Sequence, residues 1–172
     1  MGSSSGTSPG VAMAESSLKS LNDSRVSEFL KLARVAHLAT ADDASVPHNV
    51  PLCFWYHESG YFYFIIDEKP KRMTGTGLKR MRNLAANPHV ALIIDHYEED
   101  WTCLAYVLVQ GSGHIVEETN EYMLALRNLR DKYPQYRTMT LGFDRNPMVR
   151  IDPVRVHVWG ERFKLAAVAP AS

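Results

Sequence analysis

A basic segment, residues 69–82, carries the clearest chemical signal in the sequence. It holds six lysines and arginines in fourteen residues, although the whole chain has 19 basic and 19 acidic residues. A run of threonine and glycine, residues 74–77, lies among these cations just before a predicted helix. Small residues let a backbone approach a ligand closely, and a helix start presents unpaired N–H groups with partial positive charge. We therefore expect a phosphate site rather than a solvated basic helix face; its cations are Lys69, Lys71, Arg72, Lys79, Arg80 and Arg82.

A second candidate is the apolar stretch 46–56, which alternates like a strand. One face carries Val46, Val50, Leu52, Phe54 and Tyr56, and the other carries Pro47, Asn49, Pro51, Cys53 and Trp55. Proline removes a ladder donor, so two prolines indicate a sheet edge or opening. Such an edge offers free carbonyls to a flat heterocycle. A strand edge protected against aggregation explains the same pattern equally well.

The acidic segment 95–101, DHYEEDW, is the third candidate. Its carboxylates make a hard-metal site conceivable, but their spacing matches no known cage, and an acidic hairpin turn is the favoured interpretation. The seven histidines show no H-x-x-x-H pair, and Cys53 and Cys103 are interpreted as buried thiols. No G-x-x-x-x-G-K-[ST] pattern occurs, and residues 21–164 contain no G-x-S-x-G pattern. We expect no metal, and the sequence assigns no catalytic residue.

The elements that must position these residues follow from periodicity. A Ser- and Gly-rich leader, 1–20, and a short tail, 165–172, are expected to be disordered around one domain, 21–164. We expect helices from Asn22 or Asp23, over 78–86 and over 119–133. Strands are expected over 35–42, 46–57, 61–67, 89–97, 102–117 and 149–159. Six strands with helices at their margins predict a mainly β fold, a small antiparallel barrel.

Several properties bear on partners. Strands 61–67 and 102–109 are apolar on both faces, which predicts a covering helix or a second subunit, and a homodimer is the economical interpretation. The balanced charge argues against a nucleic-acid or anionic-membrane binder. No apolar run approaches the roughly 20 residues needed to span a bilayer. We expect a cytoplasmic protein that binds neither nucleic acid nor membrane.

The order of these segments resembles the pyridoxamine 5′-phosphate oxidase-like family of flavin-binding split barrels. The segments are RVAHLATADDASVPHNVPLCFWY, YFYFIIDEKPK and LKRMRNLAANPHVALIIDHY, and the resemblance covers roughly residues 24–160. More narrowly, KPK, DHYEEDW and KYPQY resemble a branch that uses the deazaflavin coenzyme F-420. The resemblance implies a six-stranded antiparallel split barrel that dimerises, with FMN or coenzyme F-420 bound at the dimer interface.

The resemblance also implies which residues hold the cofactor. Lys69, Lys71, Lys79 and Arg80 correspond to the phosphate clamp. Asn49, Val50 and Pro51 correspond to the strand against the ring, flanked by Ile66 and Asp67, and Trp101 is expected from the partner subunit. Because MTGTG lengthens the loop, either Lys69/Lys71 or Lys79/Arg80 could be the clamp. Arg72 and Arg82 would suit the acidic tail of F-420.

The implied activity is hydride transfer to or from a small organic molecule, with the redox chemistry supplied by the cofactor. Residues 156–170, VHVWGERFKLAAVAP, lack the Arg-x-His motif of genuine pyridoxamine phosphate oxidases, so vitamin B6 oxidation is not expected. Two alternatives remain open. One is a haem-binding split barrel with His48, His96 or His157 as the axial ligand; the other is a non-enzymatic flavin carrier or redox sensor.

Overall fold

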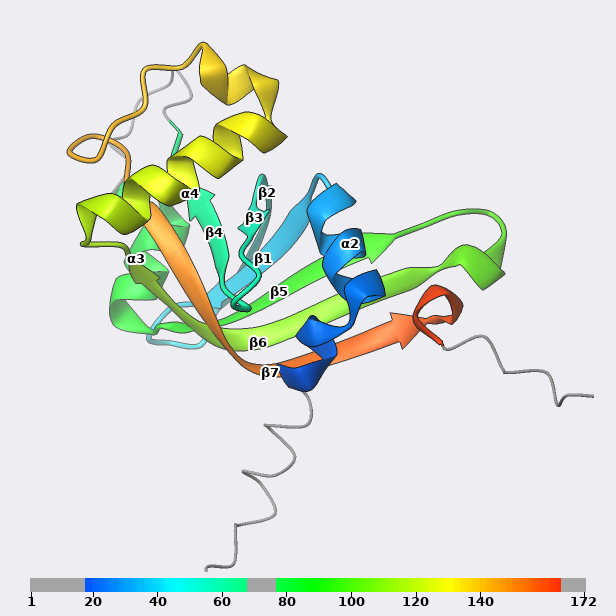
Figure 1. The fold of residues 1–172 in the computed structure, drawn as a ribbon. Coiled ribbons are helices and arrows are strands. Elements are labelled where there is room, and N and C mark those ends of the chain that lie inside the picture. Colours follow the sequence, from blue (N-terminus) through cyan, green and yellow to red (C-terminus); the bar gives the residue numbers. More distant parts are fainter. Residues whose placement is uncertain (1–17, 68–76, 165–172) are drawn as a thin grey trace, which may run out of the picture.

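The computed structural model describes residues 18–67 and 77–164, in which seven antiparallel strands form one sheet in the order β2-β1-β5-β6-β7-β4-β3 (Figure 1). The strands are β1 (Ala36–Ala41), β2 (Pro47–Leu52), β3 (Trp55–Tyr56), β4 (Phe62–Ile65), β5 (His89–His96), β6 (Ala105–Ile115) and β7 (Met148–Gly160). The α-helices are α2 (Ser24–Leu32), α3 (Lys79–Ala86) and α4 (Thr119–Lys132). Short 3₁₀ turns are η1 (Lys19–Asn22), η3 (Trp101–Cys103), η4 (Pro134–Arg137) and η5 (Glu161–Phe163).

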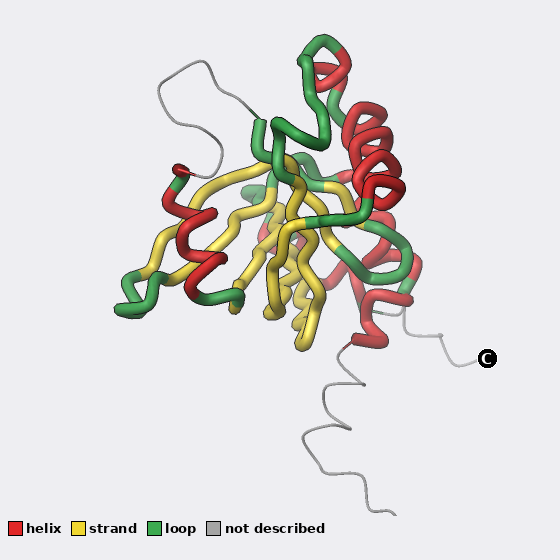
Figure 2. Tube along the Cα trace, turned by 90° about the vertical axis from the view of Figure 1, so that its left-hand side faces the viewer, coloured by secondary structure: helices red, strands yellow, loops and turns green. Residues whose placement is uncertain are grey.

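The sheet curls into a half-barrel with helices around it, which confirms the predicted mainly β split-barrel fold (Figure 2). The strand count differs from the six expected, because the predicted strand 46–57 is two strands, β2 and β3, at opposite ends of the strand order. They separate at Phe54, whose backbone N–H donates to the Tyr133 hydroxyl at 3.1 Å instead of to a neighbouring strand. A side chain from α4's end thus divides a continuous apolar stretch.

A β-bulge in the long β6–β7 pair helps the sheet to curl. Gln110 pairs with Arg155, but Gly111 pairs with Pro153, so Val154 has no opposite residue. A Cβ on Gly111 would lie 2.2 Å from the Asp152 carbonyl oxygen, which makes glycine necessary there. Glycine inside a strand commonly marks such a bulge. The bulge also explains why Val154, the residue without an opposite partner, is 58% exposed, whereas Val156 is 4% exposed.

The main core fills the concave side of the sheet. Residues from β1, β5, β6 and β7 meet there with the apolar face of α2, which contributes Val26, Phe29 and Leu30. Asp23 begins α2 as predicted, because its carboxylate accepts from the Arg25 N–H at 2.9 Å.

A second core lies where α4 covers β4. Tyr63 and Ile65 of β4 pack with Leu126 and Leu129 of α4, so the strand is buried on both faces. Of the two predicted ways to cover this strand, the helix is the one observed. The Tyr63 hydroxyl also donates to Glu121 of α4 at 2.8 Å.

The two predicted disordered ends lie outside the described residues, apart from 18–20, which enter η1. Within the described ranges, no helix combines the length and apolar character that crossing a bilayer requires.

Candidate functional site

Helix α3 is held against the sheet by one buried polar contact and one close approach. The Asn83 side-chain amide donates to the Thr40 hydroxyl of β1 at 3.0 Å, and both residues are buried. A Cβ on Gly113 of β6 would lie 2.9 Å from Leu84 Cδ2, so the glycine lets α3 approach the sheet. No side chain caps the start of α3 at Leu78 among the described residues. The first turn of α3 therefore presents N–H groups and their partial positive charge beside Lys79 and Arg80.

Lys79 reaches toward the turn after β1. Its Nζ lies 3.8 Å from Asp42 Oδ2, and the two side chains are 39% and 29% exposed. An ion pair this exposed contributes little, about 0–1 kcal/mol. Lys79 can therefore exchange Asp42 for another anion at small cost.

Arg80 points to the interior instead. Burial lowers the pKa of its guanidinium, and the nearby Asp67 and Tyr136 partly offset that effect. Its Nε is buried and has no hydrogen-bond partner among the described residues. An unsatisfied buried donor costs about 1–3 kcal/mol, and more when it is charged. An anionic oxygen placed beside Arg80 would remove this penalty.

Strand β2 is an edge strand, as its prolines predict. Asn49 and Pro51 are exposed, and Val50 is half-buried. Across the ladder, Asn49 pairs with Ala39, Val50 with Leu38 and Pro51 with His37. The exposed face of β2 therefore has one small side chain and one ring beside it on β1. His48, opposite Thr40, has a buried Nδ1 without a partner in the described part of the chain. The strand offers one open face and one unsatisfied ring nitrogen.

The remaining predicted site residues differ in position. Ile66 is 1% exposed, its N–H donates to the Pro147 carbonyl at 2.9 Å, and its carbonyl accepts from Asn146 at 3.1 Å. Its side chain is thus part of the core, and its backbone fixes the half-buried Asp67 that follows. Lys69 and Lys71, with Arg72, lie outside the described residues.

Trp101 is far from α3 within one chain. It lies in η3, 72% exposed, after the end of β5, whereas α3 comes directly before the start of β5. The eight residues of β5 span about 26 Å at a rise of ~3.3 Å per residue. The structure thus brings Arg80 and Asp67 together, turns Lys79 toward Asp42, and leaves Trp101 at the opposite end of the sheet.

Two contributors to this region were not predicted. Tyr136, 6% exposed, adds its hydroxyl dipole near Arg80 and Asp67. Asn146, 1% exposed, holds the Ile66 carbonyl and also accepts from the Gly142 N–H at 3.2 Å. Both come from the connection 133–147, where proline and glycine gave no periodic signal. For Tyr136 the one available indication was the KYPQY segment, in which it is the last residue; Asn146 had none.

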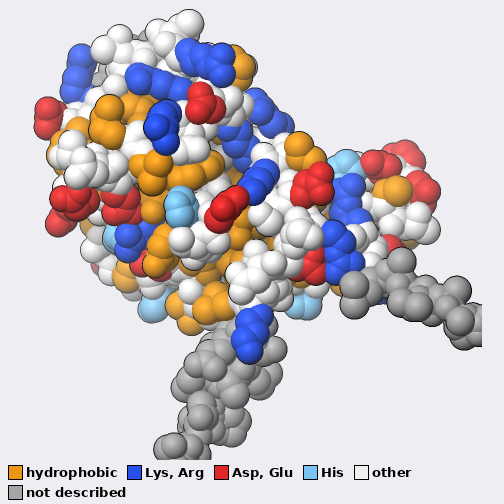
Figure 3. Space-filling model, in the orientation of Figure 1, with side chains coloured by type: hydrophobic (Ala, Val, Ile, Leu, Met, Phe, Trp, Pro, Cys, Tyr) orange, Lys and Arg blue, Asp and Glu red, His pale blue; other side chains and the backbone are white. Residues whose placement is uncertain are grey.

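The acidic segment 95–101 forms the end of the β5–β6 hairpin, where acidic side chains gather (Figure 3). His96 Nε2 lies 2.6 Å from Glu98, and Asp100 accepts from the Thr102 N–H at 3.0 Å. No group of three or more potential ligands that could hold a metal is found in the described residues. The carboxylates serve local contacts, as the turn interpretation expected.

Comparison with known proteins shows which family the sequence matches and which solved structures share the fold. Residues 23–160 match the family model described as pyridoxamine 5′-phosphate oxidase, while no curated protein matches the chain in sequence. The conserved hypothetical protein Rv2991 of Mycobacterium tuberculosis superposes with a TM-score of 0.66 at 18% identity, over 87% of this chain and 92% of that one.

Two further solved structures share the fold. The heme storage protein HutZ of Vibrio cholerae gives a TM-score of 0.62 at 15% identity, covering 81% of this chain and 97% of its own. An FAD-binding protein of Mesorhizobium loti gives 0.56 at 20% identity, covering 76% and 88%. At these identities the likeness concerns the fold alone.

Proposed function

The chain belongs to the pyridoxamine 5′-phosphate oxidase family, and we propose from this membership that it is an oxidoreductase that uses FMN or coenzyme F-420. The observation that carries the proposal is the buried Nε of Arg80 beside the start of α3, since the described residues supply neither a hydrogen-bond partner for this Nε nor a side-chain cap for the helix. A phosphate oxygen satisfies both, since it accepts from a guanidinium and from helix N-terminal N–H groups.

Different residues of the chain then contact different parts of the cofactor. Arg80 and Lys79 hold the phosphate, with Asp67 keeping Arg80 oriented. The ring lies along β2, against the exposed side chains of Asn49 and Pro51 and the backbone of Val50 between them. When bound, the flavin or deazaflavin supplies hydride chemistry toward a small organic molecule. The chain's own residues bind it, orient it and shield one side of it from water.

The sheet's convex face supports a homodimer. Tyr106 of β6 and Trp159 of β7 stack there with ring centroids 5.5 Å apart, and Trp159 is 48% exposed. Leu108 and Ile93 add apolar area on the same face. A second copy would cover these rings and bring its own Trp101 toward the first copy's cofactor. Light scattering at micromolar concentration tests this, with a dimer mass for the wild type and a monomer for Trp159→Glu.

The choice between the two cofactors depends on the acidic tail of F-420. Arg82 was expected to be available for it, but its guanidinium donates to the Gly77 carbonyl. That contact leaves FMN and F-420 with the same phosphate contacts at α3, so we expect both to bind.

The experiment is to incubate the protein with FMN or F-420, desalt it, and record the absorbance spectrum. Flavin absorbance should elute with the protein, and Lys79→Ala/Arg80→Ala should remove it while Lys69→Ala/Lys71→Ala retains most of it. The reverse result would move the clamp to the earlier pair. Failure of both cofactors to elute with the wild type would refute the proposal, and tight binding without turnover across acceptors would favour a carrier.

Haem binding is the second candidate, favoured by the buried Nδ1 of His48, to which no residue of 18–67 or 77–164 is hydrogen-bonded. The other two candidate ligands are less suited, because His96 is bound to Glu98 and His157 packs against Tyr106. Haem titration should give a Soret band that His48→Ala abolishes if His48 is the axial ligand. A band unchanged in that variant excludes this assignment.

A further inference from the structure

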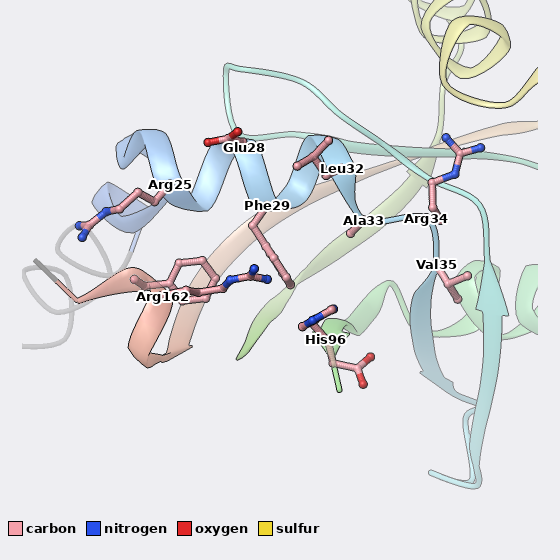
Figure 4. Close-up of a pocket in the computed structure, with 11 residues that line it drawn as sticks. Arg25, Glu28, Phe29, Leu32, Ala33, Arg34, Val35, His96 and Arg162 are labelled. Atoms are coloured by element: carbon pink, nitrogen blue, oxygen red, sulfur yellow. The ribbon is translucent and has the colours of Figure 1, made fainter. Parts of the chain in front are cut away.

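A cleft lies between α2 and η5, and neither of the functions proposed above uses it. We call it the α2 cleft. Its volume is about 700 Å³, within the range of small-molecule sites. It is lined by residues of three separate segments: α2 with the chain after it, the end of β5, and η5. Figure 4 shows how they face the cavity.

One part of the α2 cleft is apolar. Phe29 and Phe163 meet edge to face with ring centroids 5.3 Å apart. Ala33 continues this surface, and Leu32 and Val35, which also line the cleft, are 69% and 46% exposed. Large aliphatic side chains this exposed beside a cavity are suited to the apolar body of a ligand.

The other part is charged. The carboxylates of Glu28 and Asp95 line it, with Asp95 3.6 Å from His37 Nδ1, and so does the guanidinium of Arg162. Arg162 lies 5.5 Å from the Phe29 ring centroid and points into the cleft on the side of His96 (Figure 4). In the described part of the chain it makes no hydrogen bond, and the Glu98 carboxylate acts on it only at longer range. The other two arginines of the lining are already engaged. Arg25 pairs with Asp23 at 2.6 Å, and Arg34 donates to the Lys132 carbonyl.

We propose that the α2 cleft binds a small organic carboxylate with an apolar body. The carboxylate accepts hydrogen bonds from the Arg162 guanidinium, whose planar fork matches it in two-point geometry. The body of the ligand packs on Phe29, Ala33 and Val35. Phe29 holds the guanidinium in place from its other side, so little side-chain freedom is lost when the ligand binds.

This site is distinct from the phosphate region at α3. Val35 comes directly before β1, whereas Asp42, the partner of Lys79, comes directly after it. The six residues of β1 separate the two by about 20 Å at ~3.3 Å per residue. The proposal therefore holds whether or not the protein binds a flavin.

The test uses 4-phenylbutyrate as the probe and 4-phenylbutan-1-ol as its uncharged counterpart, with the cofactor-free full chain. Calorimetric titration should give an acid that binds at least about tenfold more tightly than the alcohol, because a charge-assisted contact is lost in the alcohol. Arg162→Gln should weaken the acid by at least about tenfold and leave the alcohol unchanged, and Arg162→Lys should fall between. Arg127→Gln, an exposed arginine of α4, is the matched control for charge and should change neither.

A second variant shows whether weaker binding by Arg162→Gln comes from the lost charge or from a disturbed fold. Leu32→Asp changes a side chain that is 69% exposed and lines the cleft, so the fold is kept while a negative charge is added to the lining. It should also weaken the acid selectively, and saturating FMN should displace neither probe. Equal binding of acid and alcohol, no detectable binding of the acid at millimolar concentration, or equal effects of R162Q and R127Q would each overturn the proposal.

Discussion

The Asn83 side-chain amide and the Thr40 hydroxyl are joined by a buried hydrogen bond of 3.0 Å that connects α3 to β1. Asn83 is 2% exposed and Thr40 3% exposed, so neither group can turn to water if its partner is lost. Because Lys79 and Arg80 begin the same helix, this contact fixes their position relative to β2. The hydrogen bond between Asn83 and Thr40 therefore links the stability of the protein to ligand binding at α3.

Removal of either partner should destabilise the protein. We expect Asn83→Ala and Thr40→Val each to lower the free energy of unfolding by about 1–3 kcal/mol, since each leaves a buried polar group unsatisfied or a cavity. The double variant should cost less than the sum, with a coupling of about 1 kcal/mol or more. Urea unfolding of the four proteins measures this. Strict additivity would show that the two side chains act independently.

Arg80 and Lys79 should differ in what they contribute to the free protein. Arg80→Met removes a buried donor that has no partner in the described part of the chain, so we expect the unfolding free energy to change little or to rise by up to about 1 kcal/mol. Lys79→Met, which loses an exposed ion pair, should change it by less than about 1 kcal/mol.

Binding of FMN separates the same two variants from the wild type. Each loses a charge-assisted phosphate contact, so the dissociation constant should rise by at least about tenfold in both. A marked loss of stability in Arg80→Met would instead mean that Arg80 is a structural cation paired with Asp67.

Lys132 should make stability depend on pH. Its Nζ lies 3.9 Å from the Phe54 ring centroid and donates to the Leu30 carbonyl at 3.2 Å. Burial, aided by Arg34, lowers the pKa of Lys132 from 10.5 to about 7. Above that pH the folded chain releases a proton that the unfolded chain keeps up to about pH 10.5, so the unfolding free energy contributed by this residue rises with pH from about 7.

Lys132→Met should remove this rise. Chemical unfolding between pH 6 and 9 should show a smaller increase for Lys132→Met than for the wild type, with the variant relatively more stable at the acid end. Lys19→Met, a change at an exposed lysine of η1, is the control and should keep the wild-type slope. If both variants keep that slope, Lys132 remains charged in the folded protein.

Gly111 should tolerate no side chain. A Cβ there would lie 2.2 Å from the Asp152 carbonyl oxygen, a contact with backbone that the bulge cannot relieve without moving β7. We expect Gly111→Ala to cost at least about 2 kcal/mol of unfolding free energy. Gly142→Ala, where a Cβ would meet nothing within 4 Å, is the matched control and should be neutral or slightly stabilising. Similar thermal midpoints for both variants would show that the β6–β7 bulge can shift.

Local patterns predicted most of the elements. The alternation in β1, β5 and β7 and the helical stripe of α4 appear in the structure within a few residues of the expected bounds. The Asp23 cap and the edge position of β2 were predicted because each depends on the chemistry of neighbouring residues. The expected six strands became seven for a non-local reason, the contact between Phe54 and Tyr133, which are 79 positions apart.

The candidate site also combines features that the sequence predicts with features that only the tertiary structure determines. Sequence alone determined that cations and small residues gather before α3 and that β2 is an edge with prolines, because residue type and spacing suffice for both. Only the tertiary structure decided that Arg80 turns inward toward Asp67 and Tyr136, while Lys79 turns outward to Asp42. It also brought Arg162 onto Phe29 from the far end of the chain. The direction in which each side chain turns depends on which side chains from distant parts of the chain are buried beside it. The residues next to it in the sequence do not reveal those neighbours.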